Sequence, residues 1–596
     1  MKKTHSWSGG SHLKQTAIRA EYPRPQFVRS DWLSLNGEWD FDYDDNNVGM
    51  NEGWHNEHPY SKKIVVPFCY QSKLSGIGET AFHDIVWYRR TFEMPDRWER
   101  RRLILHFGAV DYSASVWVNG VLVAQHEGGH TPFSADIGLA LREGVNEIVV
   151  RAEDYSRDMM LPRGKQYWKE KSEIIFYTRT TGIWQSVWLE AVAATYLERV
   201  KFDPDIDRNE IKMHYFIAGL DAMKDNVTQL TRITFGEEVV AEEEHRVTHS
   251  NFTRTIALHD YNDHGLGRWW SPEHPNLYNV EFMLKVDGQI VDRVTSYFGM
   301  RKISVEHGKL CLNNRPYYMR LVLDQGYFPE GILTAPSFES LKADVELTKA
   351  MGFNGTRKHQ KIEDPLFLYL CDTLGLLVWG EMANAYAYSE QYVERITQEW
   401  QEAIRRDYNH PCVVVWVPIN ESWGVPNILI DKQQQHHAMS MYHLTKSLDA
   451  SRPVISNDGW EHVKSDLYTV HDYEWRESVL LQRYAAIEGA IDAPQKREMH
   501  VGGYAYDGEP VLVTEFGGIA FRRSEWEGWG YSGATSEEDF EKRLRAVFGA
   551  LQSSPLVQGF CYTQITDVEQ EINGLLTYDR KPKLPLETIR SIVLGQ

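Results

Sequence analysis

Two apolar segments in the C-terminal half of the chain end in a glutamate. Residues 413–419 lead into Asn420 and Glu421, and residues 511–514 lead into Glu515. Two carboxylates flanking a glycosidic bond can hydrolyse it, because one protonates the leaving oxygen while the other attacks the anomeric carbon or activates water. Glu421 and Glu515 are therefore a candidate catalytic pair. The structural alternative for each is to cap the following helix or to pair with a nearby arginine.

This chemistry requires a fold that brings the two glutamates together. From residue 299 onward, short apolar runs alternate with helical periods. Eight candidate strands occupy residues 317–323, 354–359, 377–381, 413–419, 454–457, 467–471, 511–515 and 559–563, and helical patterns cover 338–351, 365–374, 391–409 and 431–448. Eight such units over this length predict a (β/α)8 TIM barrel. Barrel active sites lie at the carboxyl ends of the strands, so strands four and seven would present Glu421 and Glu515 across one opening about a sugar ring wide.

The first 298 residues show a different pattern, in which short runs of alternating apolar and polar residues are separated by turn residues. Asn119-Gly120 between apolar residues is a strong signal for a two-residue hairpin, because both turn positions need a positive φ. We predict a jelly-roll β-sandwich over residues 1–195 and an immunoglobulin-like β-sandwich without a disulfide over 196–298, ahead of the catalytic barrel at 299–596.

The amino-acid composition argues against some classes of binding partner. Against 64 Lys and Arg stand 84 Asp and Glu, a net charge of −20, which disfavours nucleic acid and anionic membranes. The five cysteines are scattered with no C-x-x-C pair, which suits reduced thiols and predicts no metal site. Two lysines near the N-terminus precede no apolar stretch, and no run approaches the ~18 apolar residues of a membrane span, so the expectation is a cytoplasmic protein.

Several motifs together resemble glycoside hydrolase family two, which includes β-galactosidases, β-glucuronidases and β-mannosidases. Asn420-Glu421 and the segment 514–517 resemble its acid/base and nucleophile signatures, and 111–120, 181–190 and 351–359 resemble segments of its sugar-binding sandwich and second barrel strand. The resemblance covers nearly the whole chain. It implies that Glu515 is the nucleophile, that Glu421 is the proton donor and then the base, and that the sugar is released with retention through a glycosyl-enzyme.

The resemblance also implies residues that bind the sugar. Asn420 would donate to the 2-hydroxyl, and Tyr473 matches a tyrosine that hydrogen-bonds the nucleophile. Three further residues end predicted barrel strands and are expected to line the ring pocket, namely Asp324, Arg357 and His359. For these the alternatives are a structural ion pair for Arg357 and a buried, satisfied side chain for His359. Tyr562 stands where many relatives place a tryptophan beneath the sugar, and its alternative is barrel packing.

The identity of the sugar is harder to predict. Glucuronidases of the family hold the substrate carboxylate with an Asn-x-Lys pair, where this chain has Glu571 and Asn573, so we expect poor activity on glucuronides. Well-known galactosidases place an aspartate at the position of Phe176, and their magnesium ligands do not match either. A β-galactosidase remains the family default. An arabinosidase, β-glucuronidase or β-mannosidase is the alternative.

Two other classes compete with a glycosidase. A metal-dependent hydrolase would need clustered ligands such as His-x-His, and His436-His437 lies in a polar helical pattern. A carbohydrate-binding protein without activity would have no reason to keep both glutamates. We predict an enzyme acting on an oligosaccharide or glycoside with no cofactor, and a homo-oligomer is left open. Trp526 and Trp529 are candidates for a lid, a subunit contact or a +1 subsite.

Overall fold

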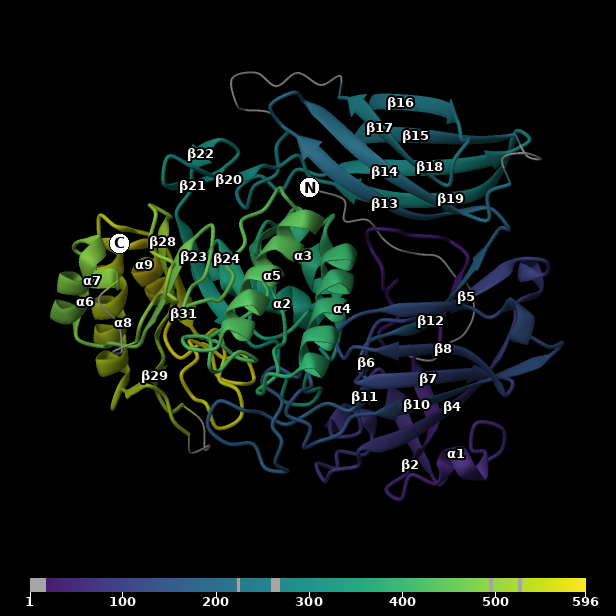
Figure 1. The fold of residues 1–596 in the computed structure, drawn as a ribbon, viewed down its shortest axis with the longest axis horizontal. Coiled ribbons are helices and arrows are strands. Elements are labelled where there is room, and N and C mark those ends of the chain that lie inside the picture. Colours follow the sequence, from purple (N-terminus) through teal and green to yellow (C-terminus); the bar gives the residue numbers. More distant parts are fainter. Residues whose placement is uncertain (1–17, 222–225, 259–267, 492–496, 524–527) are drawn as a thin grey trace.

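The computed structural model describes residues 18–221, 226–258, 268–491, 497–523 and 528–596. The chain forms three units in sequence order (Figure 1). Two β-sandwiches, coloured purple to blue and blue-teal, lie beside a barrel coloured green to yellow. The first ten residues and Trp526, on which expectations were based above, lie outside the described residues.

The N-terminal unit is a β-sandwich of jelly-roll type. Its six-stranded sheet has the order β3-β2-β4-β10-β7-β8, and its four-stranded sheet has the order β1-β12-β5-β9. The strands are β1 Trp32–Ser34, β2 Gly37–Tyr43, β3 Lys62–Val66, β4 Ile85–Glu93, β5 Arg102–Phe107, β6 Val110–Asp111, β7 Ser113–Val118, β8 Val121–Glu127, β9 Phe133–Asp136, β10 Val145–Glu153, β11 Gly182–Ile183 and β12 Val187–Val192, with the short helix α1 Gly49–Glu52. The hairpin predicted at Asn119-Gly120 is confirmed, since Val118 pairs with Val121 and both turn residues have positive φ. A long loop, residues 154–181, leaves this sandwich toward the barrel.

The second unit is an immunoglobulin-like sandwich of a three-stranded sheet, β13-β14-β17, against a four-stranded sheet, β16-β15-β18-β19. Its strands are β13 Tyr196–Asp205, β14 Glu210–Ala218, β15 Val227–Phe235, β16 Glu238–Arg246, β17 Asn251–Ala257, β18 Tyr278–Val286 and β19 Gln289–Phe298. Alternating residues of these strands form one buried apolar cluster. All five cysteines of the protein are buried free thiols.

The third unit is the barrel. A small meander, β20 Ile303–Glu306, β21 Lys309–Leu312 and β22 Arg315–Pro316, precedes a seven-stranded parallel sheet in the order β26-β25-β24-β23-β31-β28-β27. Those strands are β23 Met319–Asp324, β24 Gly355–Lys358, β25 Leu377–Glu381, β26 Val413–Val417, β27 Tyr468–Asp472, β28 Val511–Gly517 and β31 Val557–Thr563. The pair β29 Ile519–Ala520 and β30 Ser532–Gly533 follows β28. The helices are α2 Phe338–Ala350, α3 Pro365–Leu374, α4 Glu390–Asp407, α5 Lys432–Leu448, α6 Glu477–Arg483, α7 Ile487–Ile491, α8 Glu537–Gln552 and α9 Leu586–Leu594.

One predicted strand is not a regular strand. Residues 454–458 close the sheet between β26 and β27 through isolated bridges from Val454 to Trp416 and from Asp458 to Asn420. Toward β27, a side chain takes part in place of a regular backbone ladder: the amide of Gly459 donates to the Thr469 hydroxyl. The barrel is therefore closed at its fifth position by an irregular segment. No helix in the described part of the chain is both long and apolar enough to cross a membrane.

Candidate active site

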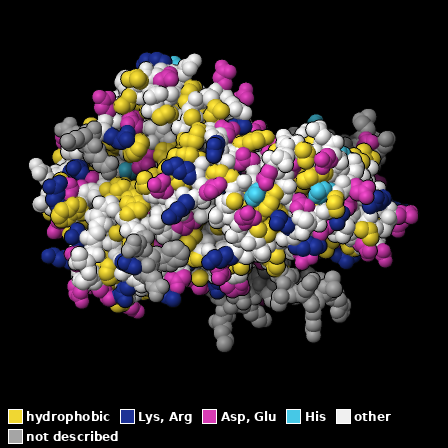
Figure 2. All heavy atoms as spheres, turned by 90° about the horizontal axis from the view of Figure 1, so that it is seen from below, with side chains coloured by type: hydrophobic (Ala, Val, Ile, Leu, Met, Phe, Trp, Pro, Cys, Tyr) yellow, Lys and Arg dark blue, Asp and Glu magenta, His cyan; other side chains and the backbone are white. Residues whose placement is uncertain are grey.

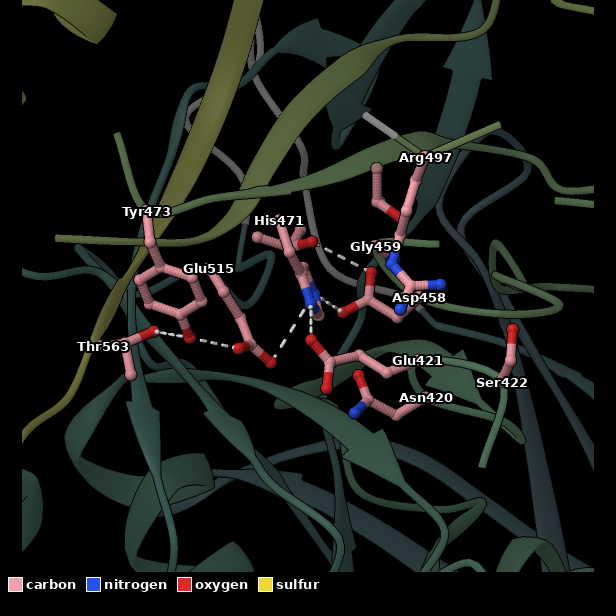
Figure 3. Close-up of polar contacts among 12 residues, drawn as sticks. Asn420, Glu421, Ser422, Asp458, Gly459, His471, Tyr473, Arg497, Glu515 and Thr563 are labelled. Carbon is pink, nitrogen blue, oxygen red and sulfur yellow. Dashed lines mark hydrogen bonds and ion pairs between the residues drawn. The ribbon is translucent and has the colours of Figure 1, made fainter. Parts of the chain in front are cut away.

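The structure brings Glu421 and Glu515 together at the carboxyl ends of β26 and β28. One carboxylate oxygen of each lies within 4.8 Å of the other, although they come from separate strands. All five residues of β26 are buried, as expected for a parallel strand covered on both faces. The chain then turns at Glu421 and Ser422, which both have positive φ, and this turn points the Glu421 carboxylate toward Glu515 (Figure 3).

Glu515 is held by two donors. The Arg357 guanidinium donates to its Oε1 at 3.0 Å, and the Tyr473 hydroxyl donates to its Oε2. The Tyr473 oxygen also lies 3.3 Å from the Thr563 hydroxyl, which can donate to it and which ties the ring to the end of β31. A buried carboxylate with a guanidinium on one oxygen and a phenol on the other is held in one orientation.

Arg357 connects the parts of the site. It is fully buried and lies 2.7 Å from Glu381 and 2.8 Å from Asp458, and it donates to the Asn420 carbonyl oxygen. Burial opposes ionisation of Asp458, but Arg357 and His471 together hold the pKa of this carboxyl well below its usual range. The ion pairs of Arg357 agree with the structural alternative raised for it, and its place in the ring pocket stays a prediction.

His471 was not among the predicted site residues, and it lies between the two glutamates. Its Nδ1 is 2.7 Å from Oε1 of Glu421, and its Nε2 is 3.2 Å from Asp458 and 3.5 Å from Glu515. Burial alone would lower the pKa of His471, but the surrounding carboxylates raise it to about 10. His471 is therefore a cation at neutral pH. The signal that could have found it is its place in β27, two residues before Tyr473.

Asn420 presents a donor to the pocket. Its side chain is fully buried, its carbonyl oxygen accepts from Arg357, and its Nδ2 has no hydrogen-bond partner within the described chain. Burying an amide without a partner is costly, so this N–H group beside the two carboxylates is available to a bound molecule.

His359 is also in the cluster. Its Nδ1 lies 2.8 Å from Glu381, the residue that also holds Arg357. Burial, together with the charges of Lys165 and Arg357, holds the pKa of His359 well below its usual range, so its ring is neutral.

Asp324 and Tyr562 lie elsewhere. Asp324 ends β23 but forms an ion pair at 2.7 Å with Lys358, whose ammonium lies over the Phe367 ring of α3. Tyr562 stacks on Phe548 of α8 in the outer core. Side chains alternate along a strand, so both residues face the helices, and neither contacts the glutamates within the described residues. We correct these two assignments.

The N-terminal sandwich contributes to the mouth of the barrel. The amide of Gly164 donates to the carbonyl of Asn384 at 3.0 Å, and this seats the loop of residues 154–181 on the barrel rim. The loop places Phe176 against Trp423, with ring centroids 5.6 Å apart, and the ammonium of Lys165 lies 4.9 Å above the same Trp423 ring.

Lys165 is 7% exposed, and its ammonium has no hydrogen bond or ion pair with the described residues, although its backbone carbonyl accepts from the Tyr177 amide at 2.9 Å. Its charge nevertheless acts on His359 and on Glu571. Glu571 accepts from Tyr177 and, at 2.9 Å, from Asn573, so its carboxylate is already engaged. No sequence motif in the loop pointed to Lys165 as a candidate site residue. Only its position in the folded structure does so.

Two groups of three potential metal ligands occur among the described residues: Glu421, His471 and Glu515, and Asp372, His410 and Cys412. In the first group, the carboxylate of Glu515 is already paired with Arg357 and that of Glu421 with His471. In the second group, Asp372 accepts from the Tyr297 hydroxyl and the Cys412 amide and lies 2.5 Å from His410. These donors and acceptors satisfy one another, so we assign neither group to a metal.

Comparison with known proteins places this geometry in a family. The sugar binding domain of glycosyl hydrolases family 2 matches residues 32–191, a second domain of that family matches 195–301, and its TIM barrel domain matches 303–517. A β-galactosidase from Thermoanaerobacter pseudethanolicus is 27% identical over 81% of this chain, and the match spans 62% of that protein. A β-glucuronidase from Sus scrofa is 26% identical over 86% of this chain and 81% of its own length.

Solved structures agree on the fold. A β-glucuronidase from Ruminococcus gnavus in complex with D-glucuronic acid superposes with a TM-score of 0.77 at 20% identity, covering 97% of this chain and 100% of that one. The three family domains occur here in order, with two carboxylates at the barrel mouth. The chain therefore belongs to glycoside hydrolase family 2.

Proposed function

We propose that this protein is an exo-acting, retaining β-glycosidase with Glu515 as nucleophile and Glu421 as acid/base. In the first step a Glu515 oxygen attacks the anomeric carbon, the bond to the leaving oxygen breaks, and Glu421 gives that oxygen a proton. In the second step Glu421 takes a proton from water, whose oxygen attacks the anomeric carbon and releases Glu515.

The observation that carries this proposal is that one carboxylate oxygen of Glu421 and one of Glu515 lie within 4.8 Å of each other. Retaining enzymes hold their carboxyl groups ~5–5.5 Å apart, whereas inverting enzymes need ~6.5–9.5 Å to admit a water. The contacts also support the two roles. Arg357 and Tyr473 hold the two oxygens of Glu515, while the Nδ1–H of His471 donates to Oε1 of Glu421.

Around this pair we propose that Asn420 donates its free Nδ2–H to the sugar 2-hydroxyl. Arg357, His359 and Tyr473 would then shape the ring pocket. We keep 1–195, 196–298 and 299–596 as proposed domain bounds, with the loop of the first domain completing the site.

The catalytic roles are tested with a panel of aryl β-glycosides. Glu515→Gln should lose at least ~10³-fold in kcat, because a carboxamide cannot form the glycosyl-enzyme. Glu421→Ala should lose activity that azide restores on an activated substrate, giving a β-glycosyl azide. Glu394→Gln, on the exposed side of α4, is the control. Full activity in Glu515→Gln would refute the mechanism.

For the glycone, we propose a neutral, galactoside-type sugar, because Glu571 stands where a uronate-binding side chain would be expected. A glucuronide is the second candidate, and a specific observation favours it. Lys165 brings an unpaired ammonium to the mouth of the barrel, near enough to His359 and Glu571 to affect both. The relatives named β-galactosidase and β-glucuronidase support both sugars.

Matched aryl β-galactoside and β-glucuronide separate the two candidates. If the sugar is neutral, the galactoside has the higher kcat/KM, and Lys165→Gln changes the preference by less than threefold. If Lys165 binds a carboxylate, wild type prefers the glucuronide and Lys165→Gln removes at least tenfold of that preference. Lys169→Gln, an exposed lysine of the same loop, controls for net charge.

A further inference from the structure

A cleft of about 410 Å³ opens beside Glu421. Its walls carry aromatic and aliphatic side chains from three parts of the chain. The loop of the first sandwich supplies Phe176, the barrel supplies Tyr386, Trp423, Ile428 and Leu429, and the segment after the irregular fifth position supplies Trp460. This volume is in the range that binds small organic molecules.

The aromatic side chains of the cleft pack against one another. The Trp423 ring lies 5.6 Å from Phe176 and 5.4 Å from Tyr386, and Phe176 stacks parallel to Tyr167 at 5.2 Å. Side chains fixed in this way lose little conformational entropy when a ring packs on them.

The cleft lies on the leaving-group side of the catalytic pair. In the view of Figure 3, Tyr473 and Thr563 are on the Glu515 side, whereas Ser422 and Arg497, which line the cleft, are on the far side of Glu421. Because Glu421 protonates the departing oxygen in the proposed mechanism, the group bonded to that oxygen extends into this cleft. This step rests on the proposed function.

The polar groups of the cleft are occupied by one another. The carboxylate of Glu461 accepts from the Ser422 hydroxyl and from Arg497 at 2.7 Å, and the Arg497 guanidinium stacks 3.4 Å above Trp460. A second sugar ring would need partners for several hydroxyls, and a planar apolar ring needs few. We propose that the cleft is an aglycone subsite that takes a planar, apolar group such as a phenol.

The test compares two substrates that share the glycone preferred in the panel above. One is the 4-methylumbelliferyl glycoside, whose ring would fill the cleft, and the other is the glycosyl fluoride, which has no aglycone. Phe176→Ala and Trp460→Ala should each lower kcat/KM for the aryl glycoside at least tenfold and for the fluoride less than threefold. Ile430→Ala, next to the cleft residue Leu429 but 84% exposed and outside the lining, should change neither.

A parallel loss on both substrates, or no loss on either, would overturn the subsite while leaving the proposed function intact. A wild type inactive on every glycosyl fluoride would instead overturn the proposed function. A second arm uses the fluoride as donor and offers phenol or glucose as acceptor. The glycosyl-enzyme should transfer its sugar to phenol with a measurable saturation constant, and preferential transfer to glucose would refute the apolar aglycone.

Discussion

At the scale of single residues, the site is a balance of buried charges. Two cations, Arg357 and His471, face four carboxylates: Glu381, Glu421, Asp458 and Glu515. Removing one partner from a buried ion pair typically costs about 3–5 kcal/mol, because the other charge stays desolvated. The two cations therefore position the carboxylates of Glu421 and Glu515 and also offset the mutual repulsion of the four acidic groups.

The charge on His471 gives a pH-dependent prediction. Its pKa is raised from 6.5 to about 10 in the folded protein, so between these values the folded state holds a proton that the unfolded state releases. The stabilisation is therefore complete below pH 6.5 and is lost as the pH rises toward 10. Compared with His471→Gln, the wild-type advantage in unfolding free energy should fall by up to about 1.4 kcal/mol per pH unit in this window.

Urea unfolding at pH 6, 8 and 9.5 measures this difference. His436→Gln, an exposed histidine of α5, should show no such trend. A wild-type advantage that is equal at pH 6 and pH 9.5 would contradict a charged His471.

At the scale of elements, the helices that surround the barrel begin where side chains can cap them. Ser337, Ser389 and Ser536 each accept a hydrogen bond from a backbone amide in the first turn of the helix that follows. These caps fix helix starts that hydrophobic periodicity alone leaves uncertain by a residue or more.

The cap of α4 can be tested by one substitution. Ser389→Ala removes the bond that its side chain accepts from the Tyr392 amide at 3.0 Å, and it should lower stability by about 1 kcal/mol. Ser440→Ala, which removes a hydroxyl from the middle of α5, should change stability by less than about 0.5 kcal/mol. Equal midpoints of urea unfolding for Ser389→Ala and wild type would show that the cap contributes nothing.

The sequence predicted elements better than side-chain directions. Seven barrel strands and the helices at 338–351 and 365–374 were placed within a few residues, because apolar runs and helical periods are local signals. The segment 454–457 was predicted as a strand, but it pairs with Trp416 only through an isolated bridge and forms no regular hydrogen-bond ladder. The side chain of Tyr562 faces the helices and not the predicted sugar pocket, because a shift of one position along a strand moves a side chain to the other face. Glu421 and Glu515 lie together as expected, because the carboxyl ends of the strands meet at one barrel rim.

At the scale of the whole molecule, the barrel alone does not build the site. Acidic and basic side chains are interspersed over the face drawn in Figure 2, so the net charge of −20 forms no single field there. The loop of the first sandwich also contributes to this region, because it carries Phe176 to the cleft beside Glu421 and Lys165 to the Trp423 ring. No local sequence pattern links this loop to Glu421.

Two features seat that loop. Gly164 has a positive φ, and a Cβ there would lie 2.3 Å from the carbonyl oxygen of Gln360, so only glycine allows this approach. The Tyr386 hydroxyl lies 2.5 Å from the carbonyl oxygen of Gly164 and 2.7 Å from that of Gln166, on either side of Lys165. The barrel thus holds the loop by its backbone, and the Lys165 ammonium lies over the Trp423 ring.

Tyr386→Phe tests whether this docking matters for activity. The ring stays in the aromatic wall, but the loop loses its hydroxyl anchor, so kcat/KM should fall about three- to tenfold on the aryl glycoside and on the glycosyl fluoride alike. This distinguishes it from Phe176→Ala, which should spare the fluoride. Tyr388→Phe, in the same barrel loop but outside the lining of the cleft, should leave both substrates unchanged. If Tyr386→Phe keeps wild-type kcat/KM on both substrates, the first sandwich is held at the barrel mouth by its other contacts.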